Sequence, residues 1–164
     1  MRHYDSMLST EIENPTALIP LLVADVFQLA GAFRKLGSRI ASRVGQTQAR
    51  WQVLSVLSGG PHTVAQIARR LGYARQSVQR TADQLVKARL ARYEANPDHK
   101  TSPLVEITEQ GASTLARITR EAEKWHVQLA SELKPSELAG ALRTLRQLCS
   151  AVEACLERKP GRRE

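Results

Sequence analysis

A pair of adjoining helical patterns in residues 63–87 constrains the fold more than any other part of the sequence. Thr63 and Gln66 have the Thr-x-x-Gln spacing of an N-terminal capping box, which predicts the start of a short helix. Gly72 is suited to end that helix, because glycine adopts the left-handed backbone conformation without strain. A longer helix is predicted over Ala74–Lys87. Two helices joined by a tight turn that contains glycine are typical of a helix-turn-helix motif.

Immediately after this pair the pattern changes from helical spacing to alternation. Leu90–Ala95 and Leu104–Ile107 alternate in part between apolar and polar residues and are predicted as two short strands. The segment between them, Asn96–Pro103, is polar and has a proline near each end, which predicts a hairpin loop. A β-hairpin directly behind a helix-turn-helix is typical of a wing, and the combination is more specific than either feature alone.

Further helices are predicted on both sides of this region. Thr47–Ser58 is predicted to form a helix that precedes the helix-turn-helix. Within Thr16–Val44 an apolar stripe recurs at spacings of three and four residues: Leu22, Val26, Leu29, Phe33, Leu36 and Ile40. The same spacing predicts one helix after Thr108 and a last one after the break at Lys134–Ser136. The predicted fold class is mainly α with a small β-hairpin wing: a winged helix-turn-helix with N- and C-terminal dimerisation helices.

The net charge of +8 is concentrated in the predicted helix-turn-helix and hairpin. Residues 62–100 contain eight basic and three acidic side chains, a net charge of +5, which favours a polyanionic partner. With Val78, Ala82 and Leu85 facing the core, helical geometry turns the polar residues of the Ala74–Lys87 helix outward. Such a helix fits the major groove of DNA. We expect base contacts from Gln76, Ser77, Gln79 and Arg80, and a base or phosphate contact from Arg75.

The hairpin and the first helix of the pair are expected to add contacts with double-stranded DNA. A flexible basic loop can lie along phosphates or enter the minor groove. The candidates, with the last two at the tip of the wing, are Thr63, Arg69, Arg92, His99 and Lys100.

The apolar stripes of the terminal helices set the expected domain organisation. A second copy of the chain would bury these stripes and hold two recognition helices about one DNA turn apart, although an intrachain bundle is an alternative. The expected dimerisation residues are Leu22, Val26, Leu138, Leu142, Leu145, Cys149 and Val152. The expected divisions are a flexible N-terminus (1–14), an N-terminal dimerisation helix (15–46), a DNA-binding domain (47–108), C-terminal dimerisation helices (109–158) and a flexible tail (159–164).

Other classes of function lack the residues that they need. Cys149 and Cys155 form no Cys-x-x-Cys or Cys/His cluster, so no metal site is predicted. The four histidines are scattered, and no nucleophile elbow, P-loop or dinucleotide-binding glycine motif is present, so we predict neither an enzyme nor a cofactor. The longest apolar run, Ala17–Ala24, is too short to cross a membrane. We expect a cytoplasmic protein without a membrane partner.

Residues 47–111 resemble the MarR family of winged-helix regulators. The matching stretches are Trp51-x-Val53-Leu54-x-x-Leu57, Gly60-Pro61-x-Thr63, Ile67-Ala68-Arg69-Arg70-Leu71-Gly72, Arg75-Gln76-Ser77-Val78-x-Arg80 and Ile107-Thr108-x-x-Gly111. The sequence departs from the family pattern at two positions. Lys100 stands where the wing usually has arginine, which keeps the charge but loses the planar guanidinium. Ala74 stands where serine or threonine often caps the recognition helix.

The resemblance implies a two-fold dimer that binds a near-palindromic operator. It also implies repression, often relieved by a small aromatic or lipophilic effector bound between the dimerisation helices and the winged domain. The aromatic residues that could line such a pocket are Phe33, Trp51 and Trp125. Two other interpretations stay open: a regulator that senses oxidants through the thiol of Cys149, and a winged-helix module that binds proteins without specific DNA binding.

Overall fold

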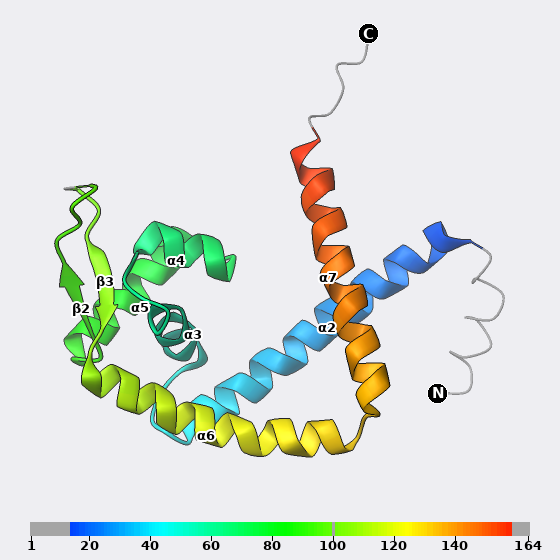
Figure 1. The fold of residues 1–164 in the computed structure, drawn as a ribbon, viewed down its shortest axis with the longest axis horizontal. Coiled ribbons are helices and arrows are strands. Elements are labelled where there is room, and N and C mark those ends of the chain that lie inside the picture. The colour runs from blue at the N-terminus through cyan, green and yellow to red at the C-terminus, as the bar shows by residue number, and fades with distance from the viewer. Residues whose placement is uncertain (1–13, 100, 159–164) are drawn as a thin grey trace, which may run out of the picture. The chain divides into compact units, whose positions relative to one another are not determined.

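The computed structural model describes residues 14–99 and 101–158. Along the chain it contains α2 (Pro15–Ser42), α3 (Gln48–Leu57), β1 (His62–Thr63), α4 (Val64–Leu71), α5 (Arg75–Lys87), β2 (Ala91–Glu94), β3 (Leu104–Ile107), α6 (Glu109–Ser131) and α7 (Pro135–Glu157) (Figure 1). The described chain divides into two compact units, of which the first ends at Ala122 and the second starts at Glu123, inside α6. The expected fold class, mainly α with a β-hairpin wing, is confirmed.

The core of the first unit forms where α3, α4 and α5 pack against the strands. α5 buries the apolar face that its spacing predicts, and α3, α4 and the strands contribute most of the other buried residues. At relative exposures of 0–7%, this cluster comprises Val53, Leu54, Leu57, Val64, Ile67, Ala68, Val78, Ala82, Leu85, Leu90, Ala91 and Val105. Burial of this apolar surface is the main term that holds the helix pair in place.

Local sequence signals set the helix ends. The hydroxyl of Thr63 accepts a hydrogen bond from the Gln66 backbone N–H at 3.2 Å, and the Gln66 side chain accepts one from the Thr63 N–H at 2.8 Å. This is the predicted capping box. Gly72 ends α4 with φ 66°, the left-handed conformation that glycine tolerates. Ala74 precedes α5 without a side-chain cap, as its methyl group requires.

The wing is a three-stranded antiparallel sheet in the order β1-β3-β2. β2 pairs with β3 so that Arg92 lies opposite Glu106 and Tyr93 opposite Val105. β1 was not predicted, because its two residues are too few to show any alternation. It pairs His62 with Val105 and thereby joins the start of α4 to the base of the wing.

The turn between α5 and β2 packs closely against the start of α6. Arg89 adopts φ 59°, and its carbonyl oxygen accepts a hydrogen bond from the Thr108 hydroxyl at 2.8 Å. The Thr108 backbone N–H donates to the Leu90 carbonyl at 3.2 Å. The same hydroxyl accepts a hydrogen bond from the Gly111 N–H at 3.0 Å and so caps α6. This junction fixes the base of the wing to the long helix that follows it.

The long helices α2 and α7 expose apolar side chains. On α2, Phe27 is 71% exposed and Val26 40%, and α7 contains no buried residue among those that the structure describes. In addition, Thr16–Ser42 has an 18-residue window of mean hydropathy 1.7, none of it buried. By length and composition alone α2 could therefore cross a membrane, which the short uninterrupted apolar run in the sequence did not indicate.

Candidate nucleic-acid interface

The second helix of the motif, α5, presents a polar face that is free of acidic residues in its first two turns. Val78, Ala82 and Leu85 are at most 1% exposed and hold the helix against the core, as predicted. Exposed side chains that can donate hydrogen bonds lie opposite that face, at Gln76 and Arg80, and on its flanks, at Arg75 and Ser77. These residues lie within about two turns of one another, which is the length that a recognition helix places against base edges.

The N-terminal end of α5 is electropositive. Its first backbone N–H groups lack a side-chain cap at Ala74, and the first turn contains no carboxylate. The unsatisfied N–H groups and the helix dipole favour an anion at this end. The guanidinium of Arg75 adds a full positive charge in the same turn.

Gln79 is the predicted base-contacting residue that the structure places differently. Its side chain is half-buried rather than exposed, and its Nε2 donates hydrogen bonds to Asp83 Oδ1 at 2.9 Å and to Tyr93 Oη at 2.7 Å. The Tyr93 hydroxyl donates to Asp83 Oδ1 at 2.6 Å. Burial, with the adjacent Asp83 carboxylate, raises the pKa of Tyr93 to about 12. The expectation of a freely exposed Gln79 is therefore wrong, because a wing strand packs beside it.

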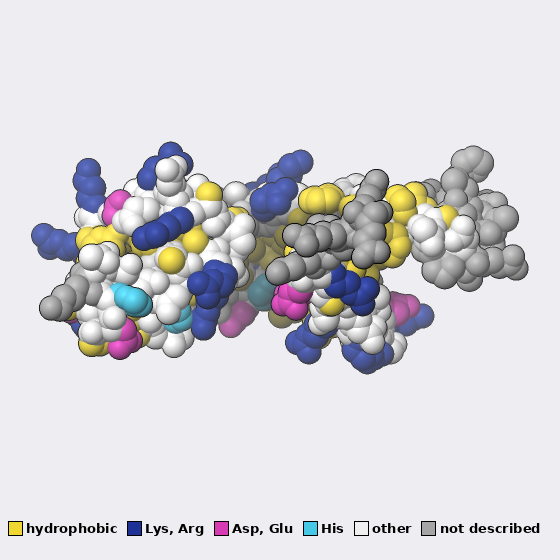
Figure 2. All heavy atoms as spheres, turned by 90° about the horizontal axis from the view of Figure 1, so that it is seen from above, with side chains coloured by type: hydrophobic (Ala, Val, Ile, Leu, Met, Phe, Trp, Pro, Cys, Tyr) yellow, Lys and Arg dark blue, Asp and Glu magenta, His cyan; other side chains and the backbone are white. Residues whose placement is uncertain are grey.

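A shallow polar pocket of about 90 Å³ separates the recognition helix from the wing. Its lining joins Arg75 and Gln79 to the start of α4 and to the returning arm of the hairpin: Thr63, Val64, Ala65, Thr101, Ser102 and Pro103. Thr63 was predicted to contact phosphate, but its hydroxyl is engaged in the capping box. Arg69, predicted for the same role, is exposed in the last turn of α4. Figure 2 shows Lys and Arg side chains projecting from the surface.

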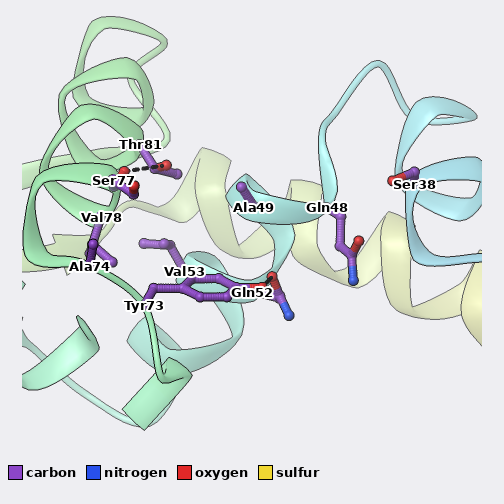
Figure 3. A pocket seen from close by; sticks show the side chains of 10 residues that line it. All are labelled: Ser38, Gln48, Ala49, Gln52, Val53, Tyr73, Ala74, Ser77, Val78 and Thr81. Carbon is purple, nitrogen blue, oxygen red and sulfur yellow. Dashed lines mark hydrogen bonds between the residues drawn. The ribbon is translucent and has the colours of Figure 1, made fainter. Parts of the chain in front are cut away.

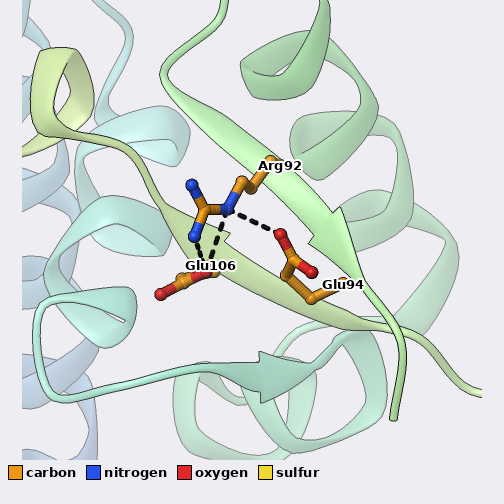
Figure 4. Close-up of polar contacts among 3 residues, drawn as sticks. All are labelled: Arg92, Glu94 and Glu106. Carbon is orange, nitrogen blue, oxygen red and sulfur yellow. Dashed lines mark hydrogen bonds and ion pairs between the residues drawn. The ribbon is translucent and has the colours of Figure 1, made fainter.

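The wing holds its predicted DNA-contacting residues in different ways. Arg92 pairs with two carboxylates, Glu106 at 2.6 Å and Glu94 at 2.7 Å (Figure 4). The hydrogen bond and charge of Glu106, with the charge of Glu94, raise the Arg92 pKa. Its charge is thus compensated within the wing, which the sequence analysis did not anticipate. His99 is exposed at the tip, and Lys100 lies outside the described residues.

A larger hollow of about 420 Å³ lies where α2, α3 and α5 meet (Figure 3). Its floor is apolar at Val53 and Val78, and its rim includes Tyr73, whose hydroxyl donates to Gln52 Oε1 at 2.8 Å. The other lining residues are Ser38, Gln48, Ala49, Ala74, Ser77 and Thr81. The three aromatic residues expected to line an effector pocket, Phe33, Trp51 and Trp125, do not line this hollow.

The expected dimerisation residues lie on the two long helices. Leu22 is half-buried in α2, whereas the other six are exposed. Cys149 and Cys155 are both free and exposed on α7.

Three residues of this surface were missed by sequence reasoning. Asp83 and Tyr93 hold Gln79, and Glu106 neutralises Arg92. The Arg92–Glu106 pair had a usable signal, since counting back across the hairpin loop places the two residues opposite each other. No signal in the sequence predicts the contact of Tyr93 with Gln79, because local spacing does not determine the distance between a strand and a helix.

The chain matches a family model described as MarR family over residues 45–100. Among curated proteins, it is 48% identical over 136 residues to the uncharacterized proteins Rv2011c of Mycobacterium tuberculosis and Mb2034c of Mycobacterium bovis. The match covers 83% of this chain and 95% of each relative.

Solved structures with the same fold include three regulators. The MarR family transcription regulator SP03579 aligns with a TM-score of 0.78 at 19% identity, over 93% of this chain and 99% of that one. A mutant MarR from E. coli complexed with operator DNA aligns at 0.70 and 19%, over 80% and 96%. The organohalide-sensing regulator RdhR-CbdbA1625 in its 2,4-dichlorophenol-bound form aligns at 0.70 and 19%, over 82% and 80%. By its motifs, its fold and these matches, the chain belongs to the MarR family of winged helix-turn-helix, DNA-binding transcriptional regulators.

Proposed function

We propose that the protein is a cytoplasmic homodimeric repressor that binds a near-palindromic operator through α5. The exposed, carboxylate-free face formed by Arg75, Gln76, Ser77 and Arg80 carries this proposal. An arginine at such a position can donate two hydrogen bonds to guanine, and glutamine can pair with adenine. Arg69 and the tip of the wing, with His99 and Lys100, would attract phosphates. The division of the chain into a DNA-binding domain over 47–108 and flanking dimerisation helices is part of the proposal.

The test is selection of operators from a pool of duplexes with randomised sequence, followed by fluorescence anisotropy titration. Arg80→Ala should weaken binding to the selected duplex by about 1–3 kcal/mol, roughly 5- to 150-fold, and relax the preference at one base pair. Arg117→Ala removes the same charge from an exposed position of α6 and serves as the control. Equal losses in both variants would remove Arg80 from the base-contacting set. If the wild-type protein selects no sequence but binds protein partners, the alternative of a winged-helix module that binds proteins without specific DNA binding is favoured.

A second copy of this chain is the occupant that we propose for the exposed apolar faces of α2 and α7. Leu138, Leu142 and Leu145 are 41–49% exposed at a spacing of three and four residues, and α7 buries nothing within the described chain. An isolated helix of this kind would be marginal in water, since most helix stability comes from packing of the apolar face. Covering both faces in a two-fold dimer supplies that packing.

Light scattering coupled to size exclusion should give the mass of a dimer for the wild type and a monomer for Leu142→Asp. Ser150→Asp, which adds the same charge at an exposed polar position of α7, should leave the dimer intact. Because α2 has the length and hydropathy of a membrane span, flotation with phospholipid vesicles is the second arm. Flotation of the wild type would overturn the covered-face proposal for α2.

The hollow at α2, α3 and α5 is where we propose that a small aromatic effector binds and relieves repression. A phenol-sized molecule would rest on Val53 and Val78, within reach of the Tyr73 hydroxyl and the Gln52 amide. Ser77 and Val78 belong to the start of α5 and Ala74 directly precedes it, so an occupant would press directly on the recognition helix. The solved relative that holds 2,4-dichlorophenol supports this class of ligand.

The effector proposal is tested with 2,4-dichlorophenol as the probe. We expect it to raise the melting temperature and to release the protein from its selected operator. Ala49→Phe, which fills the hollow from its rim, should abolish both effects without weakening DNA binding. Retention of both effects in this variant would place the effector elsewhere, for example near one of the aromatic residues Phe33, Trp51 or Trp125.

A further inference from the structure

The three side chains that join the recognition helix to the wing form a closed hydrogen-bonded set. Gln79 and Asp83 lie one turn apart on α5, and Tyr93 reaches them from β2. Gln79 Nε2 lies 2.9 Å from Asp83 Oδ1 and 2.7 Å from Tyr93 Oη, and Tyr93 Oη lies 2.6 Å from the same carboxylate oxygen. Gln79 and Tyr93 are both half-buried, and Asp83 is exposed at the edge of the set.

The chemistry of Asp83 decides which way the Gln79 amide faces. A carboxylate only accepts hydrogen bonds, so the atom turned toward it must be the amide nitrogen. The tyrosine hydroxyl uses its single proton on Asp83 and can then only accept from Gln79. A flipped amide would place its carbonyl oxygen against the carboxylate, which is repulsive. The amide oxygen of Gln79 is therefore the atom directed away from this set.

We propose that Tyr93 and Asp83 are positioning residues that make Gln79 present its carbonyl oxygen to the DNA, so that Gln79 selects a base with an exocyclic amine. Adenine and cytosine offer such a donor in the major groove, whereas the major-groove edges of guanine and thymine offer only acceptors. The proposal rests on the proposed binding of α5 to DNA and specifies what one of its residues recognises. It also makes the wing strand a determinant of base preference without itself touching a base.

The experiment compares operators selected by the wild type, Tyr93→Phe, Asp83→Asn and Gln79→Ala from the same randomised duplex pool. One position in each half-site should lose its preference in Gln79→Ala, and the wild type should select adenine or cytosine there. Tyr93→Phe keeps the ring and Asp83→Asn keeps the shape, but each removes part of the constraint on the amide. Both should lower the selectivity at that position while the other positions keep theirs. Gln84→Ala, an exposed glutamine of the same helix, is the control.

A chemical substitution in the DNA isolates the hydrogen bond. Replacing the selected base by its analogue without the exocyclic amine should cost the wild type about five-fold or more in affinity, as expected for one lost hydrogen bond. The cost should vanish in Gln79→Ala and shrink in Tyr93→Phe and Asp83→Asn.

An unchanged cost in both positioning variants, with folding confirmed by thermal melting, would overturn the inference. So would selection of guanine or thymine by the wild type at the position that Gln79→Ala relaxes. If the wild type selects no sequence at all, the proposed function is wrong, and the inference that rests on it is wrong as well. If the wild type selects a sequence and all three variants keep the same base preferences, only the inference is overturned.

Discussion

Adding one methyl group at Gly111 tests the junction between the wing and α6. In Gly111→Ala the new Cβ would overlap the carbonyl oxygen of Leu90 and lie 2.9 Å from Ile107 Cγ1. The overlapped atom is backbone, so no side-chain rotation can relieve the contact. The turn would have to move away from α6, and it is held there by the hydrogen bonds from Thr108 to the carbonyl oxygens of Arg89 and Leu90.

The expected loss of stability follows from these contacts. Forcing a methyl group into a packed site costs about 1–3 kcal/mol. Weakening these two hydrogen bonds adds up to about 2 kcal/mol. Alanine is favoured over glycine in a helix by about 1 kcal/mol, which offsets part of the loss. These terms sum to a decrease of about 0–4 kcal/mol in the free energy of unfolding. The expected value is the middle of that range, about 2 kcal/mol, which is a large share of what a domain of this size has.

Urea unfolding followed by circular dichroism measures the difference, at one protein concentration because the proposed dimerisation would contribute to stability. Gly59→Ala is the matched control, since its Cβ would also meet a backbone carbonyl, that of Val56, but at an ordinary 3.6 Å. We expect the control to change stability by no more than about 0.5 kcal/mol. A Gly111→Ala protein as stable as the wild type would refute the reasoning, because the close approach of α6 to the turn could then not be required.

Three further predictions concern the wing and the recognition helix. Ala74→Ser supplies the missing cap at a residue with φ −62° and ψ 134°, and should raise the free energy of unfolding by about 1 kcal/mol in the same urea assay; no gain would mean that the hydroxyl does not reach the α5 N–H groups. The Tyr93 pKa is raised by burial and by Asp83, so the protonated phenol stabilises the folded state below pH 10 and this contribution is lost as the pH rises toward about 12. Ultraviolet titration of tyrosinate should show a lower Tyr93 pKa in Asp83→Asn than in the wild type, and this pKa should still be above its ordinary value. A wild-type pKa near 10 would contradict the geometry. Glu106→Gln weakens the closer ion pair of Arg92 and should strengthen binding to any duplex by a few-fold with a steeper salt dependence; an unchanged salt slope would show that Arg92 lies away from the phosphates.

Local spacing was enough to predict the helices, the capping box at Thr63, the glycine end at Gly72 and the buried face of α5. Each of these features depends on residues a few positions apart, where helix geometry alone sets which side chains are neighbours. The outward positions of Gln76, Ser77 and Arg80 followed from the same geometry, which failed only for Gln79. The family resemblance was carried by these short motifs as well.

Tertiary packing decided which polar side chains of the candidate interface are already bound to other parts of the protein. Gln79 lies on the flank of α5, and only the approach of Tyr93 on a strand fourteen residues later makes it a bound side chain. Arg92 is a basic residue in the sequence, yet the hairpin register places Glu106 opposite it, and Glu94 on its own strand is a second carboxylate partner. Helical and strand periods describe one element at a time, whereas hydrogen bonds and ion pairs between elements depend on distances that the whole core sets.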